Sequence, residues 1–397
     1  MRSPRWRRVW AGSLALICCA GVAQTVAPPR DSGVSASANG PASFTWSLPR
    51  GFPEPFVPAG NPMSEDKVRL GHQLFHEPRL SVTGQQACST CHQPELAFTD
   101  GKPRAIGATG QLHPRSAMSL TNVAYNAAFT WADPTIGSLE AQVLQPLFNE
   151  HPVEMGLAGR EAQVIEALRA DPGYRVLFVR AFPGSVDPLS LANIARAIAS
   201  FERTLISGHS AFDRYVFDDD GSGMSAAARR GMALFYSERI GCAQCHSGIN
   251  FCGPLRTRRQ PEVEPAYANT GLYNTDGHGA YPPDAPGIGA VTGSAQDQGR
   301  FRVPTLRNVA VTAPYMHDGS VGTLAEVIDH YAAGGRQAPL GPTTRNSYRD
   351  PRIRAFTVSA QEKADLVAFL ESLTDDAFLR DTRFSAPDPD APAAPAR

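Results

Sequence analysis

Two Cys-x-x-Cys-His motifs are the residues best suited to carry chemistry in this chain. Two thiols at this spacing can add to the vinyl groups of a haem, and the adjacent histidine can bind the iron, so the pattern is typical of c-type haem. A single copy would also suit half of a zinc site or a redox dithiol. Two copies favour two covalently bound haem c groups. The motifs are Cys88-Ser-Thr-Cys91-His92 and Cys242-Ala-Gln-Cys245-His246.

The ligand on the far side of each iron decides what such a haem can do. A second strong ligand makes an electron-transfer centre, whereas an open position admits a small oxidant such as peroxide. The chain has ten histidines, and eight remain when His92 and His246 are set aside. Spacing alone does not select a distal ligand among them.

The N-terminal residues predict export. Residues 1–23 combine arginines, an apolar run and small residues near the end, which is typical of a cleaved secretory signal. The run is too short for an ordinary membrane span. A lipoprotein site at Cys18 is disfavoured by the bulky Ile17 before it. We therefore expect a periplasmic protein without stable membrane insertion.

Charge and cysteine content narrow the function further. Removal of the four arginines of the signal leaves 33 basic and 38 acidic residues, so nothing indicates a nucleic-acid partner. Of seven cysteines, two leave with the signal and four belong to the haem motifs. Cys252 remains, and we expect it to be a buried, inert thiol.

The segments between the motifs predict an all-α fold. Apolar residues recur at helical spacing over 160–170, 189–206 and 360–373, and no run alternates convincingly as a strand. Gly71-His-Gln-Leu74-Phe75 before the first motif is repeated as Gly231-Met-Ala-Leu234-Phe235 before the second. This internal repeat implies two cytochrome c-like haem domains with long connecting loops.

The expected organisation has five parts. They are a signal peptide at 1–23, a Pro/Ser-rich linker or arm at 24–62, an N-terminal haem domain at 63–217, a C-terminal haem domain at 218–385 and a disordered tail at 386–397. The two domains are expected to meet where Asp218-Asp-Asp-Gly221 breaks the helical pattern.

Several segments resemble the bacterial di-haem cytochrome c peroxidase and MauG superfamily. They are Phe301-Arg-Val-Pro-Thr-Leu-Arg-Asn308, Thr312-Ala-Pro-Tyr-Met-His-Asp-Gly319, His330-Tyr331-Ala-Ala-Gly-Gly335, Phe201-Glu-Arg-Thr204 and Pro152-Val-Glu-Met-Gly156. With both haem motifs, the similarity covers residues 62–373. The stretches 125–131 and 152–160 look closest to MauG-like enzymes found beside methanobactin genes, which act on a tryptophan of a partner protein.

The resemblance implies a ligand for the second haem. Peroxidases of the family have a distal methionine about 17 residues after the proline of the Pro-Tyr-x-His segment, and MauG-like enzymes have a tyrosine there. The same count from Pro314 reaches Tyr331. A haem held by His246 and Tyr331 would be six-coordinate, and Met316 is the rival ligand.

The resemblance also implies an open site at the first haem. Ala108 stands where the peroxidases have a blocking histidine, and the nearest histidine, His113, lies in a Pro-containing loop. The His92 haem is therefore expected to be five-coordinate.

The distal pocket of this first haem would contain Gln142, Pro146 and Glu154, although the spacing from proline to glutamate is two residues longer than in the family. Glu154 would take a proton from bound peroxide and return it to the departing oxygen. Ile240 replaces the tryptophan that MauG has before its second haem motif. Trp131 or another aromatic would then carry electrons between the haems.

A calcium ion between the haems is a further implication of the resemblance. Its ligands would be backbone oxygens of Thr312 and Pro314 and one side chain. The family's asparagine aligns with Ser116, and Asn122 lies six residues on. Calcium requires oxygen ligands and tolerates water in place of one of them.

These features together predict a periplasmic di-haem oxidoreductase. It would use hydrogen peroxide to form high-valent iron and oxidise an aromatic residue, foremost tryptophan, of a periplasmic protein substrate at long range. A cytochrome c peroxidase that takes electrons from a small redox protein is the alternative. A non-catalytic di-haem electron carrier is an alternative of another class.

Overall fold

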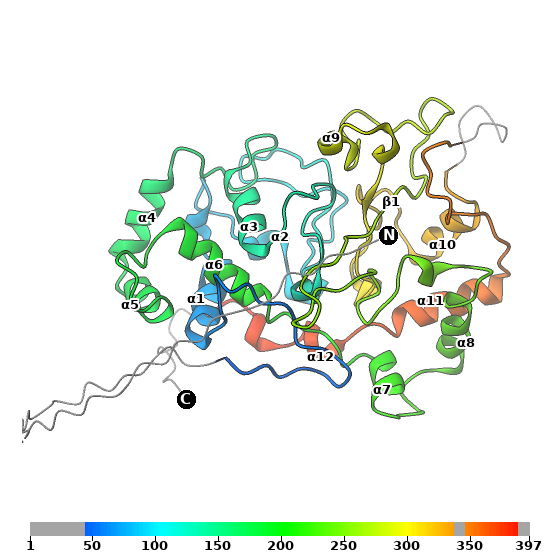
Figure 1. Ribbon diagram of the computed structural model, residues 1–397, viewed down its shortest axis with the longest axis horizontal. Coiled ribbons are helices and arrows are strands. Elements are labelled where there is room, and N and C mark those ends of the chain that lie inside the picture. The colour runs from blue at the N-terminus through cyan, green and yellow to red at the C-terminus, as the bar shows by residue number, and fades with distance from the viewer. Residues whose placement is uncertain (1–43, 337–345, 388–397) are drawn as a thin grey trace, which may run out of the picture. The chain divides into compact units, whose positions relative to one another are not determined.

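The computed structural model describes residues 44–336 and 346–387. The predicted signal at 1–23, the arm up to residue 43 and the tail from residue 388 lie outside the described residues. Within them the chain is mostly helical (Figure 1). This agrees with the expected all-α class, and the only sheet of the described residues is short, with β1 (Tyr267–Ala268) paired antiparallel to β2 (Phe301–Arg302). Strands of two residues are too short to leave an alternating pattern in the sequence.

The helices lie as follows. The α-helices are α1 (Glu65–Phe75), α2 (Cys88–Cys91), α3 (Leu139–Phe148), α4 (Glu161–Ala170), α5 (Pro172–Ala181), α6 (Leu191–Glu202), α7 (Ala211–Phe217), α8 (Ala226–Phe235), α9 (Gly289–Thr292), α10 (Leu324–Ala332), α11 (Ala360–Glu371) and α12 (Asp376–Leu379). The 3-10 turns are η1 (Pro78–Leu80), η2 (Pro94–Leu96), η3 (Val123–Tyr125), η4 (Cys242–Gln244), η5 (Ala295–Asp297), η6 (Val309–Val311) and η7 (Thr382–Phe384).

The three helices predicted from periodicity are confirmed as α4, α6 and α11. Serine residues cap the N-termini of two of these helices. At α6 the side chain of Ser190 accepts a hydrogen bond from the backbone N–H of Asn193, and at α11 Ser359 forms a capping box with Glu362. Helix α7 ends at Phe217, directly before the acidic break that the sequence indicated.

The internal repeat is a repeat of helix pairs. Helix α1 packs on α6, and α8 packs on α11 (Figure 1). A Cβ on Gly71 would lie 1.9 Å from the carbonyl oxygen of Ala197, and one on Gly231 would lie 1.9 Å from that of Asp365. Glycine therefore permits the same close helix crossing in both halves.

A second pair of matching residues extends the repeat. Asn122 and Asn308 both have a left-handed backbone, with φ of 56° and 57°, and each precedes a 3-10 turn. The side-chain oxygen of Asn122 accepts from the backbone of Ser207, and that of Asn308 accepts from Asp375, at 2.7 Å in both cases. The two asparagines thus hold equivalent chain crossings.

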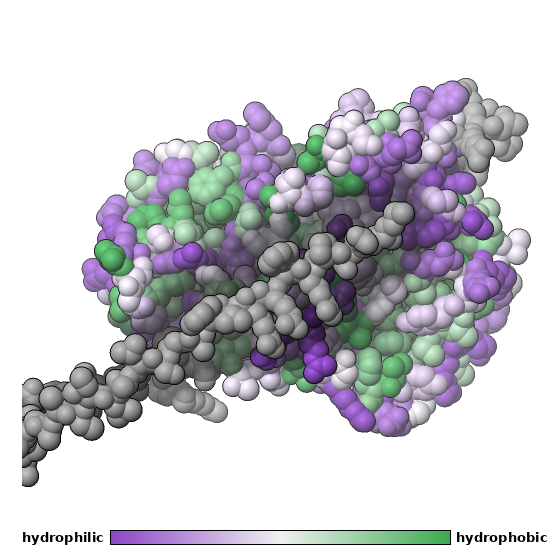
Figure 2. All heavy atoms as spheres, in the orientation of Figure 1, coloured by the Kyte–Doolittle hydropathy of each residue, from purple (hydrophilic) through white to green (hydrophobic). Residues whose placement is uncertain are grey.

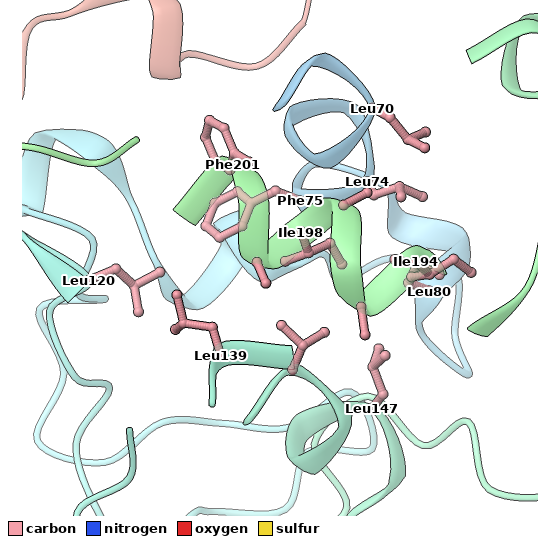
Figure 3. Packing of buried hydrophobic residues seen from close by; sticks show 14 of the residues in the cluster. Leu70, Leu74, Phe75, Leu80, Leu120, Leu139, Leu147, Ile194, Ile198 and Phe201 are labelled. Carbon is pink, nitrogen blue, oxygen red and sulfur yellow. The ribbon is translucent and has the colours of Figure 1, made fainter. Parts of the chain in front are cut away.

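Two large hydrophobic clusters form the core. In the first, Phe75 of α1 and Phe201 of α6 lie next to each other above Leu139 of α3 (Figure 3). This cluster also contains Phe378 and Phe384 from the far end of the chain. In the second, side chains of helices α8 and α11 pack with residues of the loops and of α10, and Phe212 of α7 also belongs to this cluster. The domain boundary at 217/218 stays a prediction.

The described part of the arm packs against the rest of the chain. Phe52 is buried beside Tyr125, and Asn61 donates a hydrogen bond to Glu140 at 2.7 Å. Hydrophilic and hydrophobic residues are intermixed on the face drawn in Figure 2. No helix of the described residues has the length and apolar character that a membrane span requires.

Candidate functional site

Both haem motifs place their histidine in the same way. His92 directly follows α2, and its Nδ1 lies 2.8 Å from the carbonyl oxygen of Phe98. His246 has the same contact with Phe251, also at 2.8 Å. A carbonyl only accepts, so Nδ1 carries the proton and Nε2 is left to bind a metal. Burial lowers the pKa of both histidines, which favours the neutral form that can act as a ligand.

A large cavity adjoins the second motif. Cys242, Cys245 and His246 line it together with Tyr331 and Met316. Apolar side chains form much of the remaining wall, among them Phe235, Leu324, Ile328, Leu366 and Leu370. A flat, largely apolar macrocycle attached through the two thiols suits such a lining.

Arg302 provides a second indication that the cavity suits haem. It is buried in the cavity wall, and its Nε has no hydrogen-bond partner among the residues that the structure describes. An unpaired buried guanidinium nitrogen is costly. The carboxylates on the rim of a haem would supply the missing acceptor, so the residues present fit the cofactor.

The two rival ligands of the second haem both reach this cavity. Tyr331 lies near the end of α10, and burial, reinforced by the charges of Cys242 and Cys245, raises the pKa of its phenol. Met316 has a left-handed backbone, with φ of 71°, and packs against a third hydrophobic cluster. The assignment of Tyr331 as the ligand therefore stays a proposal.

The structure brings together the residues predicted for the first distal pocket. Gln142 and Pro146 lie on α3, one helical turn apart. The backbone N–H of Met155 donates to the carbonyl oxygen of Pro146 at 2.9 Å, which places Glu154 beside the proline despite the longer spacing. Burial, aided by the charges of Asp100 and Glu154, raises the pKa of Cys91 to about 11, so Glu154 also lies near the first motif.

A loop over residues 105–115 covers Glu154. A Cβ on Gly107 would lie 1.9 Å from the carbonyl oxygen of Val153, so this close approach requires glycine. The backbone N–H of Ala108 donates to the carbonyl oxygen of Glu154 at 2.6 Å. The position where peroxidases have a histidine thus contributes a backbone contact.

The sequence did not indicate that this loop brings His113 close to Glu154. Its Nε2 lies 3.7 Å from Oε1 of Glu154. The sequence showed only a histidine in a Pro-containing loop, with no local signal for a partner in the segment that follows α3. The residue belongs to the candidate site through folding alone.

A buried carboxylic acid near the first motif was also missed. Glu202 is buried at the end of α6, and burial raises its pKa to about 8. Its charge in turn raises the pKa of Cys88, after the larger effect of burial. The Phe201-Glu-Arg-Thr204 segment indicated the family but gave this side chain no role.

The aromatic expected to connect the haems lies in the wall of the large cavity. Trp131 lines it, and its Nε1 donates to the carbonyl oxygen of Ser116 at 2.9 Å. Ile240 lines the same cavity. Electron transfer through Trp131 remains a prediction.

The residues proposed for calcium are only partly brought together. Thr312, Pro314 and Ser116 line the same cavity, and the backbone N–H of Ser116 donates to His317 at 2.9 Å. The side chain of Asn122 instead forms two hydrogen bonds with the backbone of Ser207. Its amide nitrogen donates to the carbonyl oxygen, and its amide oxygen accepts from the N–H.

Comparisons with known proteins agree with this geometry. The profile of the di-haem cytochrome c peroxidase family matches residues 65–221. The methylamine utilization protein MauG of Methylorubrum extorquens is 35% identical over 92% of this chain and 92% of its own. Cytochrome c551 peroxidase of Pseudomonas aeruginosa is 35% identical over 68% of this chain and 72% of its own.

A solved structure extends the agreement to the fold. The crystal structure of a MauG-like protein associated with microbial copper homeostasis has a TM-score of 0.83 and 43% identity, and the match covers 87% of this chain and 99% of that one. Similarity of this extent, together with two haem motifs held alike, identifies the chain as a member of the di-haem cytochrome c peroxidase and MauG family of haem-dependent, peroxidase-type oxidoreductases.

Proposed function

We propose that this protein is a periplasmic oxidoreductase that uses hydrogen peroxide to oxidise an aromatic residue, with tryptophan preferred, of a partner protein at long range. The observation that carries the proposal is the difference between its two motifs. The first adjoins Glu154 and His113, and the second shares a cavity with Tyr331. The relatives named MauG and the MauG-like protein of copper homeostasis support it.

The two motifs would serve two cytochrome c-like domains with different tasks. When bound, haem supplies the iron that binds peroxide and stores its oxidising equivalents. In the first domain, Glu154 Oε1 would accept a peroxide proton and deliver it to the departing oxygen, with Gln142 and Pro146 bounding the pocket. In the second, the half-buried Tyr331 would hold the haem iron together with His246 and so exclude peroxide.

Electron paramagnetic resonance of the oxidised protein tests this division. We expect one high-spin signal from the open first haem and one low-spin signal from the second. Two low-spin signals would contradict the proposal and favour the electron carrier. Mass spectrometry after peroxide treatment with the protein encoded by a neighbouring gene should then show oxygen insertion or cross-linking in that partner.

Replacement of Glu154 tests the proton transfer directly. Glu154→Gln should slow the reaction with peroxide by about 10²- to 10⁴-fold, the usual contribution of a positioned acid–base group, and leave the resting absorption spectrum unchanged. Glu150→Gln is the matched control, because Glu150 is an exposed glutamate of the same segment. An unchanged rate in Glu154→Gln measured by stopped flow would exclude this role.

A cytochrome c peroxidase remains the second candidate, since the Pseudomonas aeruginosa relative carries that name. Fast peroxide turnover with reduced cytochrome c, and no mass change in any partner, would favour it. Fractionation of cells that express the full chain would test the periplasmic location.

A further inference from the structure

An aromatic cluster extends away from the His246 cavity. Phe301 and His317 line the cavity and stack with ring centroids 3.6 Å apart and planes inclined by 11°. Tyr281 lies 6.4 Å from the His317 ring, and Tyr273 lies 5.4 Å from Tyr281 and 6.3 Å from His317. Rings at these separations are in edge or face contact.

The two tyrosines differ in what their hydroxyl groups contact. The Tyr273 hydroxyl donates to the carboxylate oxygen Oδ2 of Asp318. The Tyr281 hydroxyl donates to the amide oxygen of Asn269 at 2.9 Å. A phenol that loses an electron becomes a strong acid and must release its proton. A carboxylate can take that proton, whereas an amide oxygen is far too weak a base.

The charge states of the first pair suit such a transfer. Burial, together with the hydrogen bond to Asp318, raises the pKa of Tyr273 to about 12. Burial opposes ionisation of Asp318, but hydrogen bonds from Tyr273 and Ser320 outweigh it and hold the pKa of that carboxyl below its usual value. At neutral pH the pair is a protonated phenol beside an ionised carboxylate.

Tyr273 is also the less buried of the two tyrosines. Tyr281 is only 5% exposed, whereas Tyr273 is half-buried. The guanidinium of the exposed Arg336 lies 5.5 Å from the centroid of the Tyr273 ring and donates to the hydroxyl of the exposed Ser320 at 2.7 Å. The cluster thus leads from the cavity wall to a ring in contact with exposed residues.

We infer that Tyr273 and Asp318 form a relay by which oxidising equivalents pass from the His246 cavity to an aromatic residue of a partner protein. This inference rests on the proposed peroxide-dependent function. Tyr273 gives one electron to the peroxide-oxidised haem centre, and its proton moves to Asp318 Oδ2. The neutral tyrosyl radical then takes one electron from the partner, and the proton returns. Two such cycles balance one peroxide, because the partner's aromatic residue gives up the two electrons and releases the two protons that convert one peroxide to two waters.

The relay is testable in the holoprotein without a partner. One equivalent of peroxide should produce a tyrosyl radical, detected by freeze-quench electron paramagnetic resonance and narrowed by ring-deuterated tyrosine. Tyr273→Phe keeps the ring and should abolish the signal. Asp318→Asn keeps a hydrogen-bond acceptor but removes the base, so the radical yield should fall at least tenfold. Haem content and the resting spectrum should match the wild type in both variants.

Tyr267→Phe is the matched control. Tyr267 belongs to the same hydrophobic cluster, and its buried hydroxyl has no hydrogen-bond partner within the described part of the chain. This variant should keep the full radical signal. A signal that survives in Tyr273→Phe, or is unaltered in Asp318→Asn, would overturn the relay.

Failure of the relay can be distinguished from failure of the proposed function. If peroxide changes the haem absorption spectrum of the wild type but no tyrosyl radical appears, the relay is wrong and peroxide chemistry stands. If peroxide leaves that spectrum unchanged, the proposed function itself is wrong.

Discussion

The imidazole Nε2 of His113 lies 3.7 Å from Oε1 of Glu154. The Nδ1 side of the ring contacts the backbone of Arg115, with the nitrogen at 3.1 Å and the oxygen at 3.3 Å, and these contacts hold the ring in place. Burial lowers the pKa of His113, although the Glu154 charge partly offsets it, so the ring is neutral at pH 7. His113 can therefore orient the carboxylate without a fixed charge.

His113→Phe tests this positioning role. The variant keeps an aromatic ring but removes the nitrogen that faces Glu154. At 3.7 Å the two atoms lie beyond direct hydrogen-bond distance, so the loss should be smaller than that of a full hydrogen bond, and the peroxide reaction should slow by less than about tenfold, less than in Glu154→Gln. Stopped-flow rates measured over pH 5–9, a range of about four units around the usual histidine pKa, should show an altered acidic limb.

The control for this prediction is the exposed His278. His278→Gln should leave the rate and its pH profile unchanged. A wild-type low-spin signal that becomes high-spin in His113→Phe would contradict the positioning role, because it would make His113 an iron ligand.

Tyr331→Phe should remove the low-spin signal of the second haem, because phenylalanine has no oxygen to bind iron. Both haems should stay attached, since the thioether bonds form at Cys242 and Cys245. Electron paramagnetic resonance and haem staining of denatured protein measure the two properties. Met316→Leu is the comparison, and loss of the low-spin signal in that variant would assign the ligand to methionine.

Gly71→Ala and Gly231→Ala should both destabilise the fold. In each, the new methyl group would meet a backbone carbonyl 1.9 Å away, so the paired helices would have to separate. Overpacking of this kind costs about 1–3 kcal/mol. Urea unfolding should show the loss. Gly137→Ala is the control, because a Cβ there meets nothing within 4 Å, and an equal loss in that variant would contradict the steric explanation.

Acid should weaken the fold through His76. Burial, with a smaller effect of His72, lowers the pKa of His76 from 6.5 to about 4. Between these values the unfolded chain binds the proton and the folded chain does not, so the free energy of unfolding falls as the pH drops from 6.5 to 4. His76→Gln should make this fall shallower in urea titrations at pH 4.5 and 6.5. An identical fall in both proteins would show that His76 does not contribute.

The motifs, the helices and the repeat could be predicted because each depends on neighbouring residues. Haem attachment requires two thiols and a histidine within five positions, and an amphipathic helix repeats its apolar residues every turn. The same holds for Gly71 and Gly231, which occupy equivalent places in two similar segments. These features depend only on residues that are close together in the sequence, so the sequence alone predicts them.

The pairing of distant side chains was decided only by tertiary structure. His113 meets Glu154 because the glycine at 107 lets two loops touch, and Phe384 enters the first core because the chain returns to it after the second half is complete. The hydroxyl of Tyr273 contacts the carboxylate of Asp318, and the hydroxyl of Tyr281 contacts the amide of Asn269. Neither pairing follows from the spacing of these residues in the sequence. Sequence alone thus determined which groups can bind haem. Packing determined which acid, base and phenol lie beside them, because the distances between separate segments depend on the whole core.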